Sequence, residues 1–429
     1  MSPRFALDPF EGKYAHRTSS MLSSEIRDLL SVTARPDIIS LAGGLPFTQA
    51  LDAETILRTV RGVLEDDCAA ALQYGPTDGY APLKRDLMAI MAAEGTPCFP
   101  EDIMITNGAQ QGLELIAKIF INPGDNIITE APSYVGALNS FLSYQPCIHS
   151  IPLDGQGLRT DLLEEKLVEL ARQDRRAKFI YVVPNFQNPA GITMSRERRF
   201  RLLELAHEHD CLVVEDNPYG LLRFEGEPEP SLRSLDEGRV VYLGTLSKIF
   251  AAGMRIGWVA APHPILDKLL LAKQSADLCS STFVQMVAHR YLSSEDWRGQ
   301  VERLREIYRG RRDAMLEALH EHLEGIARWT NPQGGLFVWV TLPEFIKASE
   351  MLAAAIDARV AFVPGTGFFP YRGGESCMRL NFSYADEETI HEGIKRLARV
   401  IKHELSLARA LGYAVALPPE EEAGGLTGG

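Results

Sequence analysis

The stretch Val240-Val241-Tyr242-Leu243-Gly244-Thr245-Leu246-Ser247-Lys248 joins an apolar, β-branched run to a short polar turn that ends in a lysine. Gly253, Arg255 and Gly257 follow soon after. The pattern predicts a buried strand that presents Lys248 at its end. A lysine held against apolar walls loses its proton more easily and becomes a nucleophile towards carbonyl groups. The alternative for a single Ser-Lys pair is a solvated surface lysine.

Further apolar strand candidates lie on both sides of this stretch, and helical patterns separate most of them. The strand candidates are Ile103–Thr106, Ile127–Glu130, Phe179–Val183, Leu212–Glu215 and Ile256–Ala260, and the helical stretches include Gln111–Phe120 and Glu197–His209. This alternation predicts an α/β fold with a mostly parallel central sheet buried on both faces. Ligands of such sheets bind at the carboxyl ends of the strands.

The pattern changes after about residue 300. A long amphipathic helix is expected over Arg303–His322, then short strands and a final helix: Leu336–Thr341, Ala361–Val363, Ser376–Phe382 and Glu387–Leu407. We therefore expect a large domain at 51–300 and a smaller α+β C-terminal domain at 301–416. Residues 1–50 form an N-terminal segment, with a helix near Ser23–Leu30, that contributes to the substrate site and small domain. Residues 417–429 are expected to be a flexible tail.

Composition excludes several classes of protein. The 429 residues carry 44 Lys and Arg against 57 Asp and Glu, a net charge of −13, which argues against a nucleic-acid or anionic-membrane surface. The six cysteines are widely spaced and form no Cys-x-x-Cys pair, so neither disulfides nor a metal site are expected from them. No signal peptide or membrane span is recognisable, and a cytoplasmic protein is the simplest expectation.

Polar residues follow several of the predicted strands. Asn107-Gly108-Ala109-Gln110 stands between a strand and a helix, where backbone N–H groups form an anion site. The segment Pro184–Gly191 follows the strand candidate Phe179–Val183 and contains Asn188 in an Asn-Pro turn, which by itself needs no function. Asp216 comes directly after a buried strand, where a carboxylate is costly without a partner. A cationic ring nitrogen is a suitable partner; capping of the next turn is the structural alternative.

Taken together, these groups match the needs of pyridoxal 5'-phosphate. Lys248 is suited to form an imine, Asp216 to hold a pyridinium nitrogen, and Asn188 with Tyr219 to hydrogen-bond a phenolate oxygen. The helix start at Gly108–Gln110, with Ser247 and Arg255, is suited to hold a phosphate.

With these motifs in order, the chain resembles the class I/II aminotransferases of fold type I, which depend on pyridoxal phosphate. The similarity is nearest to the α-aminoadipate/kynurenine subgroup and its bacterial multi-substrate relatives. It runs from about Ser24 to about Ile401. The matching stretches are Leu41–Pro46, Gln73–Gly79, Asn107–Gly112, Pro184–Gly191, Glu215–Tyr219, Gly244–Lys248 with Arg255, and Met378–Phe382.

The resemblance implies a role for each matching position. Lys248, Asp216 and Tyr219 would be catalytic, and Lys248 would carry the cofactor covalently. The implied cofactor-binding residues are Gly108, Ala109, Gln110, Tyr134, Asn188, Asp216, Tyr219, Ser247, Lys248, Arg255 and Tyr74, with Tyr134 stacked on the ring. Tyr74 would reach the phosphate of a second subunit, which implies a homodimer with shared active sites.

The implied substrate-binding residues are Gly43, Gly44, Asn188 and Arg379, where Arg379 would clamp the α-carboxylate. The implied reaction moves the amino group of an L-amino acid to a 2-oxo acid, expected to be 2-oxoglutarate. The donor would be aromatic, branched-chain or of the 2-aminoadipate type.

The sequence contains fewer signals for the side chain of the preferred donor. Aminoadipate-specialised relatives use an arginine in the N-terminal helix region, and Ser20 aligns with it here, with Arg17 nearby but out of register. This departure argues against specialisation for aminoadipate. Leu45, Phe47 and the pair Phe368-Phe369 offer apolar surface for aromatic or branched substrates, or else pack in the core.

Two rival functions share the same fold. One is a pyridoxal-phosphate lyase, which product analysis would distinguish. The other is the effector-sensing domain of a transcription regulator, which would need a basic winged-helix domain upstream; we do not expect it in this acidic chain.

His207-Glu208-His209 and His320-Glu321-His322 look superficially like metal ligands. A spacing of two on a helix points the rings to different sides, so solvated helix faces are the expectation.

Overall fold

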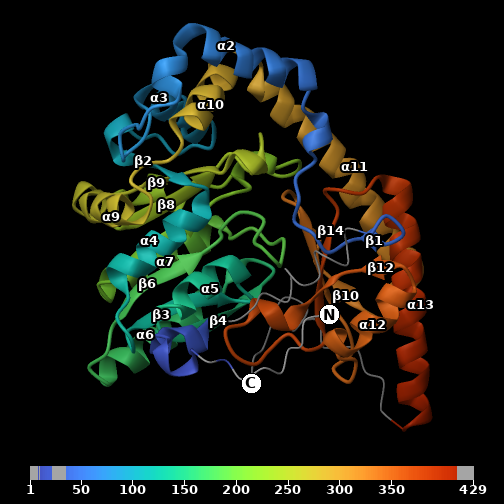
Figure 1. Cartoon of the computed structure of the whole chain (residues 1–429). Coiled ribbons are helices and arrows are strands. Elements are labelled where there is room, and N and C mark those ends of the chain that lie inside the picture. The colour runs from blue at the N-terminus through green and yellow to red at the C-terminus, as the bar shows by residue number, and fades with distance from the viewer. Residues whose placement is uncertain (1–7, 9, 22–34, 413–429) are drawn as a thin grey trace.

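The computed structural model describes residues 8, 10–21 and 35–412. An eight-stranded sheet forms its centre (Figure 1), with the spatial order β2-β9-β8-β7-β6-β3-β4-β5. The strands are β2 (Ile103–Asn107), β3 (Asn126–Ala131), β4 (Cys147–Asp154), β5 (Gly157–Leu158), β6 (Ala177–Val182), β7 (Leu212–Asp216), β8 (Val240–Thr245) and β9 (Ile256–Ala260).

The direction of β9 is the feature of this sheet that shapes the site. The neighbours β4, β3, β6, β7 and β8 run parallel, whereas β9 is antiparallel to both β8 and β2. Ile256 pairs with Asn107, and Gly257 pairs with Thr245. The start of β9 therefore lies where β2 and β8 end, which brings Arg255 to the carboxyl edge of the sheet.

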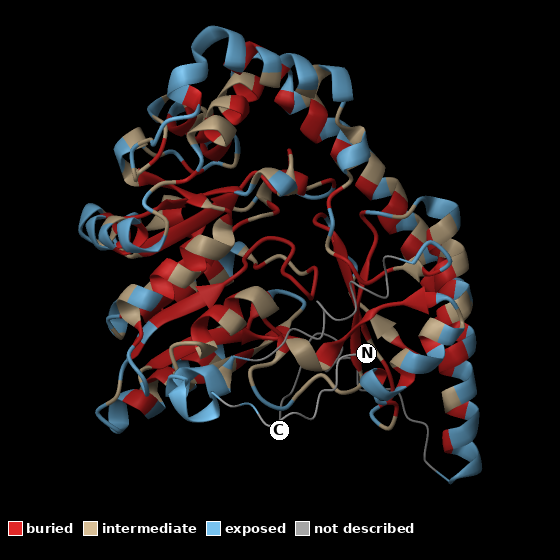
Figure 2. Cartoon of the chain, in the orientation of Figure 1, coloured by how far each residue is buried: buried red, intermediate tan, exposed pale blue. Residues whose placement is uncertain are grey.

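Both faces of the sheet are apolar and covered by helices. Successive residues of a strand face opposite sides, so Val214 and Tyr181 belong to one core cluster and Val213 and Ile180 to another. Each such buried apolar side chain stabilises the fold by about 1.5–3 kcal/mol relative to an exposed one. Figure 2 shows the strands as buried throughout most of their length. These findings confirm the predicted α/β fold with a mostly parallel sheet.

The helices around this sheet form two groups. On one side α4 packs against α5 and α9, and on the other α7 packs against α6 and α8. Their bounds are α4 (Ala109–Phe120), α5 (Val135–Leu142), α6 (Thr160–Arg172), α7 (Arg196–Glu208), α8 (Leu232–Leu235) and α9 (His263–Ala276). A further group, α2 (Ala53–Ala71), α3 (Ala81–Ala93) and α10 (Thr282–Ser294), packs together at the top of Figure 1.

A second, antiparallel sheet has the order β10-β11-β14-β13, and a two-stranded sheet joins β1 to β12. The strands are β1 (Ile39–Ser40), β10 (Arg328–Trp329), β11 (Phe337–Thr341), β12 (Val360–Ala361), β13 (Val363–Pro364) and β14 (Cys377–Asn381). The accompanying helices are α11 (Trp297–Leu323), α12 (Ala348–Asp357) and α13 (Glu387–Ala410). In Figure 1, α11 runs from the α2 and α10 group towards this sheet, and α13 packs against α11.

Short 3₁₀ helices connect these elements. They are η1 (Glu11–Lys13), η2 (His16–Ser20), η3 (Thr48–Ala50), η4 (Pro100–Asp102), η5 (Gly220–Leu222), η6 (Ala252–Met254) and η7 (Gly365–Phe368). Among the described residues, no helix is both long and apolar enough to cross a membrane.

The structure corrects one predicted strand and adds a strand that was not predicted. The run 361–363 is not one strand, because the chain changes sheets at Phe362: β12 pairs with β1, and β13 pairs with β14. All of these residues are buried, so hydrophobicity alone did not distinguish the two partners. Strand β4 was missed because it is only half-buried and carries polar residues such as His149 and Ser150. The helix expected near Ser23–Leu30 and the tail 417–429 lie outside the described residues.

Candidate active site

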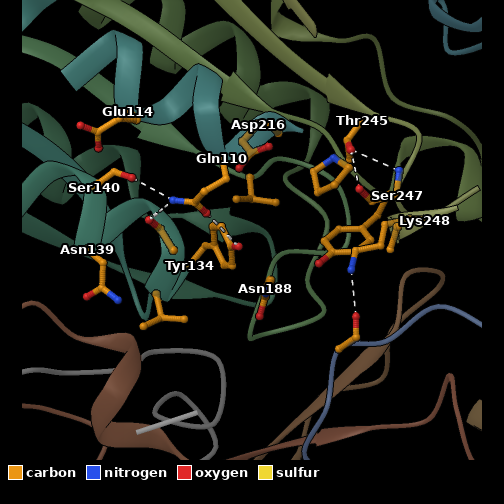
Figure 3. A pocket seen from close by; sticks show the side chains of 18 of the residues that line it. Gln110, Glu114, Tyr134, Asn139, Ser140, Asn188, Asp216, Thr245, Ser247 and Lys248 are labelled. Carbon is orange, nitrogen blue, oxygen red and sulfur yellow. Dashed lines mark hydrogen bonds between the residues drawn. The ribbon is translucent and has the colours of Figure 1, made fainter. Parts of the chain in front are cut away.

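A cavity of about 610 Å³ lies at the carboxyl edge of the eight-stranded sheet (Figure 3). The ends of β6, β7 and β8, the starts of α4 and α5, and residues of β11 and β14 border it. The predicted site residues that line it are Gly44, Ala109, Gln110, Tyr134, Asn188, Asp216, Tyr219, Ser247, Lys248, Arg255 and Arg379. Segments far apart in the sequence thus meet in one place.

Lys248 projects into this cavity from the turn after β8. Its Nζ donates a hydrogen bond to the carbonyl oxygen of Gly44 at 2.8 Å (Figure 3). Burial lowers the pKa of Lys248 to about 8, and the positive charges of Arg379 and Arg255 act in the same direction. A lysine with this pKa exists partly as the free amine near neutral pH, which is the nucleophilic form.

Asp216 is the last residue of β7 and is buried. Burial raises the pKa of Asp216 to about 6, while a hydrogen bond from Tyr181 opposes that rise. The Tyr181 hydroxyl donates to Oδ2 of Asp216 at 2.7 Å. The carboxyl is therefore mostly ionised at neutral pH, and a buried carboxylate calls for a cationic partner.

The neighbouring Glu215 has a different environment. Its side chain accepts hydrogen bonds from the backbone N–H groups of Leu232 and Arg233, at 3.0 and 2.8 Å. Because adjacent strand residues face opposite sides of a sheet, only the second carboxylate of this pair reaches the cavity.

A cradle for an anion forms where α4 begins. The first N–H groups of a helix have no partner within it and attract negative charge, together with the helix dipole. Gly108, with φ of 73°, precedes the helix, and a Cβ there would lie 2.3 Å from a guanidinium nitrogen of Arg255. Glycine at this position therefore lets Arg255 approach the helix start. Ser247 adds a hydroxyl beside them, held by Thr245 Oγ1 at 2.9 Å.

Tyr134 and Gln110 form one wall of the cavity. The Tyr134 hydroxyl donates to Gln110 Oε1 at 3.3 Å, and Gln110 Nε2 donates to Ser140 Oγ at 2.8 Å (Figure 3). On another wall, Asn188 Oδ1 accepts a hydrogen bond from Arg379 Nη1 at 2.9 Å, and the ring of Tyr219 packs edge-on against Phe337. Each of these side chains is fixed by a neighbour, so the polar groups keep defined positions.

Arg379 reaches the cavity from β14 of the smaller sheet. Nη1 donates to Asn188 Oδ1 at 2.9 Å and Nη2 to the carbonyl oxygen of Ala42 at 2.8 Å. Its Nε is buried and has no hydrogen-bond partner among the described residues. The guanidinium lies over the rings of Phe337 and Phe368, at 4.2 and 5.0 Å from their centroids. Burial lowers the pKa of Arg379 to about 10, so the group stays charged and suits a carboxylate ligand.

Three of the predicted site residues do not line the cavity. Gly43 directly precedes a lining residue, Gly44, and Gly108 directly precedes another, Ala109. Tyr74 lies in the loop between α2 and α3 with 78% of its surface exposed.

Several residues at the cavity were not predicted from the sequence. They include Glu114, Asn139, Ser140, Thr245 and Phe337 in its lining, and Tyr181 behind Asp216. The register of β6 and β7 holds the signal for Tyr181, because Tyr181 lies opposite Val214 and so on the same face as Asp216. That signal requires the strand register, which the sequence pattern alone did not supply.

The arrangement fits pyridoxal 5'-phosphate. An amine with a lowered pKa, a buried carboxylate and an anion cradle surround one cavity, as its aldehyde, ring nitrogen and phosphate require. The unpartnered Nε of Arg379 adds a place for a substrate carboxylate.

Comparison with known proteins agrees with this geometry. Residues 37–397 match the family model described as aminotransferase class I and II. An aromatic-amino-acid aminotransferase of Thermococcus litoralis is 49% identical over 92% of this chain and 95% of its own length. A 2-aminoadipate transaminase of Thermus thermophilus is 39% identical over 92% of this chain and 97% of its own length.

A solved structure adds the same fold with ligands. The kynurenine aminotransferase of Pyrococcus horikoshii, in complex with PMP and KYN, superimposes with a TM-score of 0.88. It is 48% identical, and the match covers 92% of this chain and 98% of that one.

Proposed function

The chain belongs to the class I and II aminotransferases, and from that premise we propose that its donors are L-amino acids of the aromatic, branched-chain or 2-aminoadipate type, with 2-oxoglutarate as the expected acceptor. The enzyme is a pyridoxal-phosphate-dependent aminotransferase. Two observations support these donor side chains: the similar proteins include an aromatic-amino-acid aminotransferase and a 2-aminoadipate transaminase, and the apolar rings of Phe337 and Phe368 lie beside Arg379. The positive charge of Arg379 supports an amino acid as donor, because it suits the α-carboxylate.

We assign each side chain one task. Lys248 would hold the cofactor, and in each half of the reaction its amine, when free, would remove the proton from the substrate Cα as general base and give it up again as general acid. Asp216 keeps the ring nitrogen protonated. Arg379 binds the α-carboxylate and so orients the Cα–H bond. When bound, the cofactor supplies the electron sink for the carbanion at Cα.

The remaining assignments concern binding of the cofactor. Ala109, Gln110, Ser247 and Arg255 hold the phosphate, Gly108 allows their approach, and Tyr134 stacks on the ring. Asn188 and Tyr219 hydrogen-bond the ring oxygen. Gly43 and Gly44 form the backbone wall of the substrate site, supported by the hydrogen bond from Lys248 to Gly44.

The observation that carries the proposal is the meeting of Lys248, Asp216 and Arg379 in one cavity, although they come from the turn after β8, the end of β7 and β14. Changing Lys248→Ala tests it. We expect at least a thousandfold loss of kcat with 2-oxoglutarate as acceptor, since proton transfer by a positioned base contributes about 10²–10⁴-fold. Lys118→Ala, on the exposed side of α4, is the matched control and should leave kcat unchanged. Full turnover by the Lys248 variant without added amine contradicts the assignment.

A donor panel tests the substrate class. Phenylalanine, tyrosine, kynurenine, leucine and 2-aminoadipate are compared by kcat/KM at fixed 2-oxoglutarate, with aspartate as an unrelated donor. We expect efficient transfer from the aromatic and branched-chain donors. Activity with 2-aminoadipate alone would overturn this expectation and the reading of Ser20. Release of ammonia and a 2-oxo acid from one amino acid without an acceptor would favour a lyase.

Three broader assignments belong to the same proposal. We infer a homodimer, in which Tyr74 of each subunit completes the site of the other; its exposure supports this. A cytoplasmic location is inferred from the composition and the unpaired cysteines. The domain bounds 51–300 and 301–416 are supported by the division of the strands: those of the eight-stranded sheet end at Ala260, and those of the four-stranded sheet begin at Arg328.

A further inference from the structure

Three side chains that the reaction does not use meet where the end of α11 packs on the beginning of α13. They are Glu321 and His322 of α11 and His391 of α13. One nitrogen or oxygen atom from each lies within 4.8 Å of the other two. His391 Nε2 and Glu321 Oε2 are 3.0 Å apart, and His322 Nε2 and Glu321 Oε1 are 3.8 Å apart. None of the three lines the cavity around Lys248.

His322 shows that an ion pair between Glu321 and His391 does not account for the whole cluster. Its Nε2 is buried and has no hydrogen-bond partner among the described residues. The Glu321 oxygen at 3.8 Å is beyond hydrogen-bond distance. A buried polar nitrogen without a partner is costly, and a ligand at this point would remove that cost.

The surroundings hold the three side chains on rigid elements. Leu319 and Leu323 of α11 and Ile390 and Ile394 of α13 are buried in the same core cluster, which fixes the two helices against each other. His322 also lies in the last turn of α11, where the helix dipole favours a positive charge.

The expectation that the two histidine rings of His320-Glu321-His322 point to different sides is confirmed. His320 and His322 do point to different sides: His320 packs edge-on against Trp329 at 5.0 Å, and His322 faces His391 at 5.5 Å. What the sequence did not reveal is that α13 supplies the second imidazole.

We propose that Glu321, His322 and His391 form a binding site for a divalent transition-metal ion of the zinc class, which clips α11 to α13. Two imidazole nitrogens and one carboxylate oxygen are ligands that Zn²⁺ accepts, whereas Mg²⁺ and Ca²⁺ prefer all-oxygen sites. Ligands about 2.1 Å from a tetrahedral ion lie about 3.4 Å apart, so small side-chain rotations complete the geometry. Glu321 and His391 are partly exposed, at 56% and 39%, which leaves a fourth position to water.

The test measures zinc binding by the cofactor-loaded enzyme after treatment with a chelator. Equilibrium dialysis against ZnCl₂ gives stoichiometry and affinity, and Co²⁺ serves as a spectroscopic probe of coordination. The Tm of thermal unfolding measures how much the ion stabilises the fold. The variants are His391→Asn and His322→Ala, and His320→Ala is the matched control on the same helix. MgCl₂ replaces ZnCl₂ as the control ion.

We expect one Zn²⁺ per chain, a higher Tm with zinc, and at least tenfold weaker binding in His391→Asn and His322→Ala, with His320→Ala unchanged. Should His322→Ala fail to fold, His391→Asn and Glu321→Gln at the partly exposed positions decide alone. The proposal is overturned if zinc does not bind, if it binds equally well to His391→Asn, if His320→Ala weakens it as much, or if Mg²⁺ gives the same response. Transaminase activity is not the readout, so failure here leaves the proposed function untouched.

Discussion

At the scale of single residues, the hydroxyl of Tyr181 sets how strongly Asp216 holds its charge. It donates to Oδ2 at 2.7 Å and opposes the rise that burial causes in the pKa of Asp216. In Tyr181→Phe the donor is lost, so the pKa of Asp216 should rise further above about 6. We expect kcat to fall at least tenfold, because a hydrogen bond to a charged group contributes roughly 1.5–3 kcal/mol. The acidic limb of the pH–kcat profile should move to higher pH.

Tyr242→Phe is the matched control for this prediction, since Tyr242 is equally buried but donates to Glu94, outside the cavity. An unchanged pH profile in Tyr181→Phe would remove Tyr181 from this role. The two tyrosines also show which part of the site could not be predicted from the sequence. Strand ends were enough to select Lys248, Asp216 and Asn188, but the neighbour of Asp216 depended on a register that only the folded sheet contains.

At the scale of elements, Glu130 near the end of β3 ties the Pro184–Gly191 loop to the sheet. Its Oε2 accepts from Val183 N at 3.1 Å and from Gln187 Nε2 at 3.0 Å. Burial raises the pKa of Glu130 to about 8 from an ordinary value of 4.5. The folded state then keeps a proton that the unfolded state loses, so stability falls as pH rises from about 4.5 to about 8. The slope for one such group is up to about 1.4 kcal/mol per pH unit.

Glu130→Gln removes this titration, so its Tm should fall less than that of the unchanged protein between pH 5.5 and about pH 8. Thermal unfolding of the two at several pH values provides the measurement, with the exposed Glu65→Gln as control. Parallel curves would mean that Glu130 is ionised in the fold. The loop itself was predicted from its Asn-Pro turn; its tether was not, because Glu130 is far from it in sequence.

At the scale of the whole molecule, the prediction concerns shared active sites. If Tyr74 completes the site of a second subunit, a Lys248→Ala chain still supplies an intact Tyr74 to its partner. Mixing Lys248→Ala with Tyr74→Ala under conditions that exchange subunits should therefore give more activity than the two separate homodimers combined. Size-exclusion chromatography with light scattering checks that dimers are present.

Activity that never exceeds the sum of the separate variants would place all catalytic groups within one chain. The class of fold was accessible from the sequence because alternating strands and helices leave a clear pattern. The direction of β9 could not be predicted, because the same apolar run is compatible with a parallel or an antiparallel strand.

The antiparallel direction of β9 restricts the length of the turn between β8 and β9. The segment from Leu246 to Arg255 leaves β8 and returns through β9, and the Leu246 N–H donates to the carbonyl oxygen of Ile256 at 3.1 Å. Both ends of the segment are thus fixed by strand pairing. Lys248 and Arg255 lie within it, so an insertion or deletion between them would displace the lysine and the arginine together. The turn is a link of fixed length, and the residues between Lys248 and Arg255 can vary more freely than their number.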